Sequence, residues 1–166
     1  MKGRRSAEVS TACRSGEGAP TLVLDESTRC PVSQTTGRPV GSITLKALLT
    51  ENALRRLEGR MYRFCPEPHC EVVYFSSEAG PIFRKRDLRV RVGQKESEDP
   101  VPLCYCFDVA LADLRNDLLT SGGTDIPEKI AREVEAGRCA CEIRNPQGSC
   151  CLGNIRGALR QLNATS

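Results

Sequence analysis

The sequence contains little aromatic material, no tryptophan and a single histidine. Three tyrosines and four phenylalanines supply every aromatic side chain in the 166 residues, and hydrophobic residues make up 39% of the chain. A chain of this length forms one ordinary domain or two small ones. A core with so few large side chains is thin, so we expect something besides apolar burial to stabilise the fold.

Motifs and segments that would assign a function directly are also missing. No G-x-S-x-G, P-loop or G-x-G-x-x-G pattern occurs, so hydrolytic catalysis is not expected. The opening MKGRRSAEVSTACRSGEG carries charges and lacks the apolar centre of a secretory signal, and no stretch approaches the length of a membrane span. We therefore expect a cytoplasmic protein with no membrane span.

Charge of one sign is not concentrated in any part of the chain. The net charge is +3, and the lysines and arginines are scattered among acidic residues. A balance this mild does not favour binding to nucleic acid. We therefore expect no nucleic-acid partner.

Cysteine, in contrast, is abundant. The sequence has ten, at Cys13, Cys30, Cys65, Cys70, Cys104, Cys106, Cys139, Cys141, Cys150 and Cys151. Disulfides, metal sites and inert buried thiols are the three competing explanations. Metal binding is favoured because the chain shows no secretory signal, and because pairs one residue apart or directly adjacent resist ordinary disulfide geometry.

Sequence composition divides the chain into three parts. Residues 1–27 are polar and aperiodic and predict a disordered tail that includes Cys13. The charged and then proline-rich stretch GQKESEDPVP (93–102) predicts a boundary between a module at 28–95 and a module at 96–166.

The first module is predicted to be rich in strands, with one helix. The stretch SITLKALLTENALRRL (42–57), after a turn-rich loop from Arg29, predicts a short helix with Ser42 as its N-cap. Strands are expected at MYRF (61–64), EVVYFS (71–76) and IFRKRDLRVRVG (82–93).

The second module is predicted to be helical. We expect helices at 107–119 with Asp108 as N-cap, at 125–137, and at 152–162. Asp125 and Glu128 have the spacing of a capping box, and Gly137 supplies a C-terminal stop. The fold class expected for the whole chain is therefore α+β.

Cys30, Cys65 and Cys70 form the first candidate metal site. In FCPEPHC, two prolines stiffen the loop between Cys65 and Cys70, and CPVS brings Cys30 from a separate loop. Three thiolates and one further donor make a tetrahedral zinc site. His69 is the least certain ligand, with a carboxylate, water or Cys13 as alternatives, and the zinc would be structural.

The second candidate site lies in PLCYCF and GRCACEIRNPQGSCC. Packed helices would bring these two loops to one end of the module, near helix N-termini whose N–H groups favour an anionic cluster. The Cys-x-Cys pair suits a [2Fe–2S] cluster, in which each iron takes two thiolates, and a second zinc ion is the rival.

Six cysteines compete for the four ligand positions of this second site. Cys104 and Cys106 are expected ligands, and Cys141 and Cys151 are favoured among the rest because they flank the EIRNPQGSC turn. Cys139 and Cys150 are the alternates, or thiols that tune the cluster or bind another soft metal.

Several long motifs together resemble a known family. CPVSQTTGRPV, FCPEPHCEVVYF, DLRVRVG, VPLCYCF and GRCACEIRNPQGSCCLG are similar to the N-terminal zinc and [2Fe–2S] region of CopZ-type copper chaperones. The second half also resembles the bacterioferritin-associated-ferredoxin-like (BFD-like) [2Fe–2S] domain. The likeness runs from about Cys30 to Leu162.

The resemblance implies a zinc module followed by a small helical cluster module, with a link to copper handling and heavy-metal resistance. The family's zinc motif matches Cys30, Cys65 and Cys70, and its cluster motif matches Cys104, Cys106 and a downstream pair. The chaperones continue into a domain with a Met-x-Cys-x-x-Cys loop, and this sequence has no such loop. We therefore expect a partner to supply the copper(I) site.

Two functions are compatible with these features. The first is a one-electron redox or accessory component that serves a metal-trafficking or redox partner in copper or other heavy-metal handling, without catalysis of its own. In that role it would supply an electron, for example to reduce Cu(II) to Cu(I). The second is a sensing module in which the cluster or the spare thiols bind Cu(I) or Hg(II).

Overall fold

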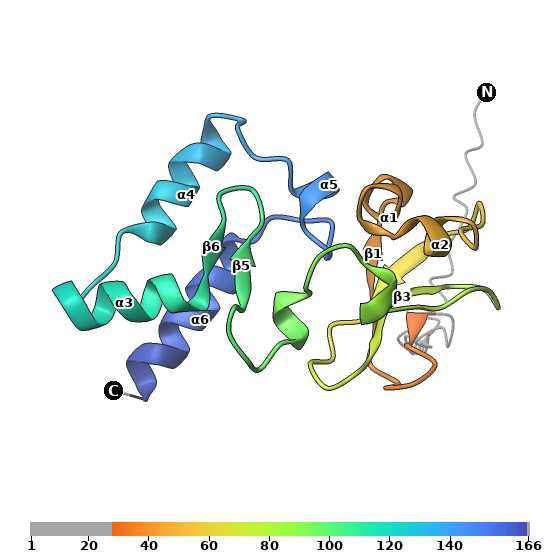
Figure 1. The fold of residues 1–166 in the computed structure, drawn as a ribbon, viewed down its shortest axis with the longest axis horizontal. Coiled ribbons are helices and arrows are strands. Elements are labelled where there is room, and N and C mark those ends of the chain that lie inside the picture. Colours follow the sequence, from red (N-terminus) through yellow and green to blue (C-terminus); the bar gives the residue numbers. More distant parts are fainter. Residues whose placement is uncertain (1–27, 166) are drawn as a thin grey trace, which may run out of the picture.

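The computed structural model describes residues 28–165, in which an antiparallel sheet is followed along the chain by a group of helices (Figure 1). The predicted tail at 1–27, and Cys13 within it, lie outside the described residues. The mixed architecture, with strands mostly preceding helices, confirms the α+β class.

The sheet has four antiparallel strands in the order β1-β2-β3-β4. Their bounds are Arg38–Val40 for β1, Tyr62–Phe64 for β2, Val72–Ser76 for β3 and Phe83–Arg84 for β4. The VVYF run of β3 is buried throughout, as expected for the β-branched and aromatic residues of a central strand. Helices α1 (Ser42–Leu48) and α2 (Glu51–Leu54) follow β1 and pack on the sheet.

The helix predicted at 42–57 is two short helices. Leu49 adopts an extended conformation with ψ of 146° and forms an isolated bridge with Leu88, and Thr50 N–H donates to the Asp87 carbonyl at 2.9 Å. The Thr50 hydroxyl then caps α2 by accepting from Ala53 N–H. Pairing with a distant segment therefore interrupts the helix, and Ser42 is its first residue, with Gly41 at the N-cap.

The strand predicted at 82–93 is also wrong for most of its length. β4 has two residues, and a 3₁₀ turn, η2 (Lys85–Asp87), follows it. The Asp87 carboxylate accepts from Arg84 N–H at 2.8 Å and pairs with Arg56 at 2.6 Å, which turns the chain away from the sheet. A second 3₁₀ turn, η3, covers Gly93–Lys95.

The helical half of the chain, residues 102–164, begins with a hairpin that the sequence analysis did not predict. β5 (Pro102–Cys104) pairs with β6 (Val109–Ala110). Asp108, the predicted N-cap, lies in the hairpin turn with φ of +50°, and Asp113 accepts from Ala110 N–H at the start of α3 (Leu111–Ser121).

The remaining helices are α4 (Ile126–Glu135), α5 (Cys141–Arg144) and α6 (Leu152–Ala164). Helices α4 and α6 lie close to their predicted positions, and Gly137 adopts the predicted stop with φ of +68°. Asp125 makes no capping bond and pairs with Lys129 at 2.8 Å instead. α3, α4 and α6 surround a core that contains Leu114, Ile130 and Ile155.

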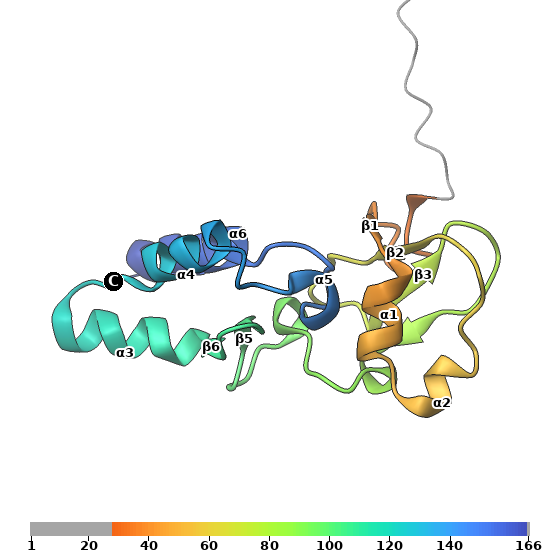
Figure 2. The ribbon, with the colours of Figure 1, turned by 90° about the horizontal axis from the view of Figure 1, so that it is seen from above.

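Short helix α5 lies beside α1 and connects the helical half to the sheet (Figures 1 and 2). Thr44 on α1 is 1% exposed, and its hydroxyl donates to the Glu142 carbonyl of α5 at 2.6 Å. None of the helices in residues 28–165 has the length and apolarity that crossing a bilayer requires.

Candidate metal sites

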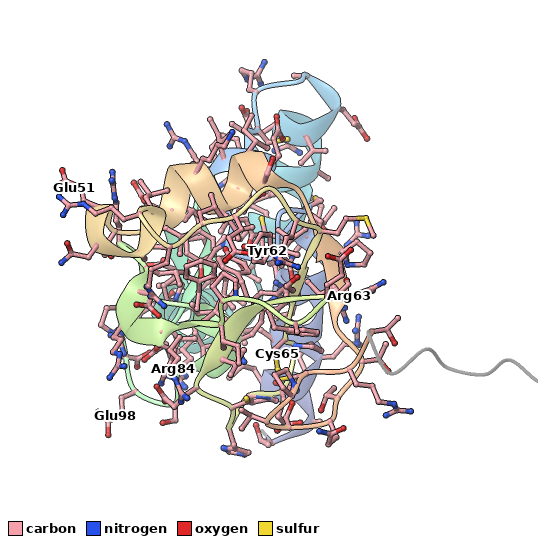
Figure 3. All side chains as sticks on the ribbon, turned by 90° about the vertical axis from the view of Figure 1, so that its right-hand side faces the viewer. Glu51, Tyr62, Arg63, Cys65, Arg84 and Glu98 are labelled. Atoms are coloured by element: carbon pink, nitrogen blue, oxygen red, sulfur yellow. The ribbon has the colours of Figure 1, made fainter. Side chains whose placement is uncertain are left out.

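The first group of thiols lies at one edge of the four-stranded sheet. Cys30 is in the loop before β1, Cys65 follows β2 directly, and Cys70 lies two residues before β3. The Cys65 N–H donates to the Val73 carbonyl at 2.9 Å, so the β2–β3 pairing fixes the first residue of the loop (Figure 3). The antiparallel register thus brings the two ends of FCPEPHC together.

The three sulfurs form a buried group whose dimensions fit one ion. All three lie within 4.8 Å of one another, and the Cys30 and Cys70 sulfurs are 3.9 Å apart. Thiolates around a tetrahedral zinc at the usual Zn–S length are separated by about 3.8 Å. Cys30 and Cys65 are 0% exposed and Cys70 is 5% exposed. This buried, sulfur-only donor set suits Zn²⁺.

Ser33 contacts the thiols from the Cys30 loop. Its hydroxyl is 3.4 Å from the Cys65 sulfur. Burial acts to raise the pKa of the Cys30 thiol, but hydrogen bonds from the Ser33 side chain and backbone oppose it, and the net direction is downward. Burial raises the pKa of the Cys65 thiol. The sequence carried no signal for this contact between Ser33 and the sulfurs.

His69 is not part of the thiol group. Its side chain is exposed, and its imidazole is absent from the set of donor atoms that lie within 4.8 Å of one another. The histidine is exposed, whereas the adjacent Cys70 is buried. The structure thus does not gather the predicted ligand His69 with the three sulfurs, and its role as the fourth zinc donor stays a prediction.

A buried lysine, which no sequence motif indicated, faces the same group. Lys95 is 6% exposed, and its ammonium donates to the carbonyls of Glu67 at 2.7 Å and Cys70 at 3.0 Å. Burial lowers its pKa, whereas the nearby thiolates act to raise it. Three thiolates around Zn²⁺ carry one net negative charge, which this ammonium would offset.

The second group of thiols is arranged as two close pairs. The sulfurs of Cys106 and Cys141 are 3.9 Å apart, and the side chains of Cys104 and Cys151 are hydrogen-bonded to each other. The Cys151 N–H bonds to the Cys141 sulfur and links one pair to the other. Within the described residues, no three of these four sulfurs lie within 4.8 Å of one another, unlike the first group.

Backbone N–H groups point at the sulfurs of this second group. Cys104 accepts from the N–H groups of Cys106 and Phe107, and Cys106 accepts from Ala140 N–H at 3.3 Å. The Cys151 hydrogen bond, followed by these backbone donors, lowers the pKa of Cys104 to about 6. The shared proton correspondingly raises the pKa of Cys151.

The other two downstream cysteines lie at the margin of the group. Cys139 is half-buried and Cys150 is exposed, whereas Cys141 and Cys151 are 6% and 1% exposed. Cys141 and Cys151, which the sequence analysis favoured over Cys139 and Cys150, are thus the more buried of the four downstream thiols. Their role as cluster ligands stays a prediction.

The loop between Cys141 and Cys151 is held by buried amides. Asn145 Nδ2 donates to the Ser149 carbonyl at 2.8 Å, and its Oδ1 accepts from Gln147 N–H at 3.2 Å. Gln147 Nε2 donates to the Cys150 carbonyl at 3.1 Å. Both amides are almost fully buried, so the NPQGS sequence forms a rigid turn rather than a flexible connection.

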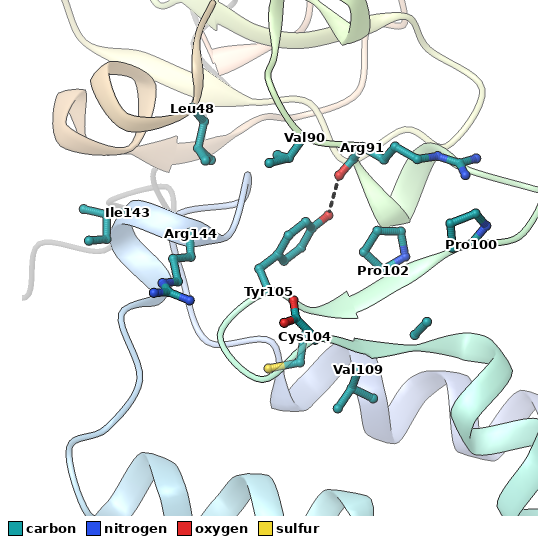
Figure 4. Close-up of a pocket in the computed structure, with 12 residues that line it drawn as sticks. Leu48, Val90, Arg91, Pro100, Pro102, Cys104, Tyr105, Val109, Ile143 and Arg144 are labelled. Carbon is teal, nitrogen blue, oxygen red and sulfur yellow. Dashed lines mark hydrogen bonds between the residues drawn. The ribbon is translucent and has the colours of Figure 1, made fainter.

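A cavity of about 540 Å³ opens beside Cys104 (Figure 4). Its lining is mostly apolar, with contributions from Leu48, Val90 and Ile143, and its charged groups include Arg144. Tyr105 also lines it, but its hydroxyl donates to the Arg91 carbonyl at 2.9 Å. Phe107 packs against the helical core.

Comparison with known proteins identifies the first thiol group. Residues 27–89 match a family described as a zinc binding domain of CopZ type. The copper chaperone CopZ of Archaeoglobus fulgidus is 38% identical over 124 residues, which cover 74% of this chain and 57% of that protein. The X-ray structure of the A. fulgidus CopZ N-terminal domain superposes with a TM-score of 0.64 at 35% identity, covering 78% of this chain and 95% of that domain.

This chain belongs to the family of the CopZ N-terminal domain. The matched zinc-binding segment contains Cys30, Cys65 and Cys70, so the residues that the structure gathers at the sheet edge lie in a domain recognised for zinc. The chain spans 57% of the length of the CopZ protein it matches.

Proposed function

We propose that this chain is a zinc and iron–sulfur protein that acts as a one-electron accessory component in copper or other heavy-metal handling. The observation that carries the proposal is the contrast between the two thiol groups: one compact buried triad, and one set of two pairs. The relationship to CopZ supports metal binding in copper handling.

The two-pair arrangement favours a binuclear cluster over a second zinc ion. A single tetrahedral ion draws all four sulfurs into one group with equal separations of about 3.8 Å. A [2Fe–2S] cluster instead takes two thiolates on each iron, which leaves two close pairs with the cluster between them. Cys106 with Cys141, and Cys104 with Cys151, match the second pattern. The helical half would then be a cluster module of BFD-like type.

Backbone N–H groups and the burial of the thiols make this site suitable for an anionic cluster that carries one electron. When bound, the cluster would supply reversible one-electron chemistry. The N–H groups of Ala140, Cys106 and Phe107 donate to ligand sulfurs, and such bonds stabilise added negative charge and raise the reduction potential. Burial of Cys104 and Cys151 at 1% exposure keeps water from these thiolates.

The zinc site has a structural role in this proposal. It replaces apolar packing at a sheet edge where Cys30, Cys65 and Cys70 form a small core with Val72 and Phe75. Metal binding by a site that the unfolded chain lacks contributes directly to folding free energy.

The partner would be a cytoplasmic metal-trafficking or redox protein. The cavity beside Cys104 offers an apolar surface next to one pair of thiols, and exposed Arg144 makes no ion pair among the described side chains. An electron delivered at this surface would be available for reduction of Cu(II) to Cu(I), the form that copper-trafficking thiolates bind.

Anaerobic purification with metal analysis tests the proposal. We expect two irons, two sulfides and one zinc per chain, with a brown [2Fe–2S] absorption spectrum that one electron bleaches reversibly. Cys104→Ser should abolish the chromophore, whereas Cys150→Ser, at an exposed neighbouring thiol, should leave it intact. A colourless protein with two zinc ions would overturn the iron–sulfur assignment.

Metal sensing is a second candidate, favoured by the exposure of Cys150 directly beside buried Cys151. A soft ion captured at Cys150 would compete for the neighbouring thiolate. Addition of one equivalent of Cu(I) or Hg(II) to the reduced protein separates the two functions. Rapid loss of the chromophore favours sensing, and an intact chromophore that still cycles favours electron transfer.

A further inference from the structure

The turn η3, Gly93–Lys95, contacts the loops of both thiol groups. It lies between the sheet and the helical half, outside every cysteine motif, and each of its three residues bonds to a different loop. These bonds connect two sites that share no residue.

Lys95 makes the contact with the zinc-site loop. Its ammonium donates to the carbonyls of Glu67 and Cys70 at 2.7 and 3.0 Å and lies 5.8 Å from the centre of the Phe64 ring. A buried ammonium depends on its acceptors, because losing them leaves a charge without water or partner. The position of Lys95 is therefore tied to the conformation of the FCPEPHC loop.

Gly93 makes the contact with the first loop of the second group. Its N–H donates to the Tyr105 hydroxyl at 2.9 Å, and Tyr105 lies between Cys104 and Cys106. A Cβ at position 93 would lie 1.8 Å from the Pro102 carbonyl oxygen, so the turn is packed directly against strand β5. The turn cannot shift without moving that strand.

Gln94 makes the contact with the second loop. Its side-chain amide donates to Gln147 Oε1, and Gln147 in turn holds the Cys150 carbonyl. A parallel connection runs through β3, because the buried Tyr74 hydroxyl donates to the Pro146 carbonyl at 2.8 Å. Both loops of the second group are thus braced against the part of the chain that carries the zinc thiols.

We propose that zinc bound by Cys30, Cys65 and Cys70 holds, through η3, the loops that carry Cys104, Cys106, Cys141 and Cys151 in their ligand-binding geometry. Without zinc, the FCPEPHC loop opens locally, Lys95 loses its acceptors, and the two distant loops open more often. Linkage makes the effect reciprocal, so whatever fills the second site also strengthens zinc binding. This coupling rests on the proposed function only in one respect, namely that the group bound at the second site is a [2Fe–2S] cluster.

Thiol alkylation of cluster-free protein tests this coupling without iron. Iodoacetamide labelling followed by mass spectrometry gives an opening rate for each cysteine, with and without one equivalent of zinc. We expect zinc to slow labelling of Cys104, Cys106, Cys141 and Cys151 by about tenfold. Exposed Cys150 is an internal reference whose rate should not change.

Variants at the two ends of the connection identify its route. Lys95→Met should bind zinc and yet lose most of the protection. Tyr105→Phe should bind zinc and lose the protection of Cys104 and Cys106, because Gln94 still connects the turn to the loop of Cys141 and Cys151. Tyr62→Phe is the matched control, because the Tyr62 hydroxyl accepts from Glu58 N–H within the sheet part of the chain and should retain protection. If Lys95→Met fails to bind zinc, Tyr105→Phe decides, since the Tyr105 hydroxyl bonds to the backbone of Gly93 and Arg91, neither of which is a zinc-site residue.

Cys65→Ser controls for zinc that binds directly at the second group. The coupling would be overturned if the unaltered chain showed no protection, if protection persisted in Cys65→Ser, or if Cys104 and Cys106 stayed protected in Tyr105→Phe. Iron and sulfide analysis is a separate measurement. Its failure would remove the cluster assignment and leave the coupling result standing.

Discussion

Cys65 is one of three thiols on which the zinc site depends, because it is fully buried, contacts Ser33 and lies within 4.8 Å of both other sulfurs. Serine is a poor zinc ligand, so Cys65→Ser should weaken zinc binding by at least about 100-fold. Competition with a chromogenic chelator measures the affinity. Cys139→Ser is the matched control, since Cys139 lies outside the triad, and equal affinities in the two variants would contradict the assignment.

Gly93 tests how tightly the connecting turn is packed. Gly93→Ala places a methyl group 1.8 Å from the Pro102 carbonyl oxygen, so we expect it to lower the free energy of unfolding by about 1–3 kcal/mol. Gly123→Ala is the control, because nothing lies within 4 Å of its added Cβ, and it should change the free energy by less than about 0.5 kcal/mol. Urea denaturation compares them, and equal effects would show that the turn can relax.

The zinc thiols were predictable at the residue scale, and their neighbours were not. The cysteine–proline spacing in FCPEPHC is a local signal, and the structure gathers Cys65 and Cys70 with Cys30 as expected. Lys95 and Ser33 act through contacts that depend on the path of the whole chain. A lysine in a charged stretch, GQKESED, normally indicates a solvated surface. His69 was predicted from its adjacency to Cys70, and the structure leaves it outside the thiol group, so its role as a ligand stays a prediction.

Among the local elements, the NPQGS turn sets the separation of Cys141 and Cys151. Asn145 is 1% exposed, and its amide bonds across the turn to the Ser149 carbonyl and Gln147 N–H. Asn145→Ala removes both hydrogen bonds and leaves the buried Gln147 N–H without its acceptor, which should cost about 1–3 kcal/mol. Asn116→Ala, on the exposed surface of α3, should cost less than about 0.5 kcal/mol.

Urea unfolding of both asparagine variants gives this comparison. Iron content of anaerobically purified protein provides a second readout, since a loosened turn should retain less cluster. If Asn145→Ala were as stable as Asn116→Ala, the turn would not be the rigid spacer that its hydrogen bonds indicate.

Element prediction succeeded where local periodicity and packing agreed. Helix α6 and strand β3 have strong periodic or β-branched patterns and lie where expected. The stretch 42–57 holds two short helices where one was predicted, because Leu49 pairs with Leu88. The predicted strand at 82–93 is wrong for most of its length because Asp87 bonds back to Arg84 and Arg56. In both places a long-range contact outweighed a local preference of a few tenths of a kcal/mol per residue.

At the scale of the whole molecule, the sequence predicted a boundary between two modules near 93–102. The structure shows in this stretch the contacts that connect the loops of the two thiol groups. η3 lies inside that stretch and bonds to both thiol loops, and α5 packs against α1. Hydrogen bonds between distant loops leave no periodic trace in a sequence. The division of the chain into separate modules therefore remains a prediction, while the connection between its two halves is a property of the described fold.

We expect the reduced protein to exchange electrons through the cavity beside Cys104. The rate of this exchange with small charged oxidants should therefore depend on the sign of the charge at position 144. In Arg144→Glu, oxidation of the reduced protein by anionic hexacyanoferrate(III) should slow by about threefold or more at low salt, and oxidation by cationic hexaammineruthenium(III) should accelerate. Both effects should fade above about 0.5 M salt as screening increases. Arg38→Glu, on β1 and away from the cavity lining, changes net charge equally and should have little effect. Equal responses in the two variants would mean that overall charge, rather than this cavity, controls approach to the site.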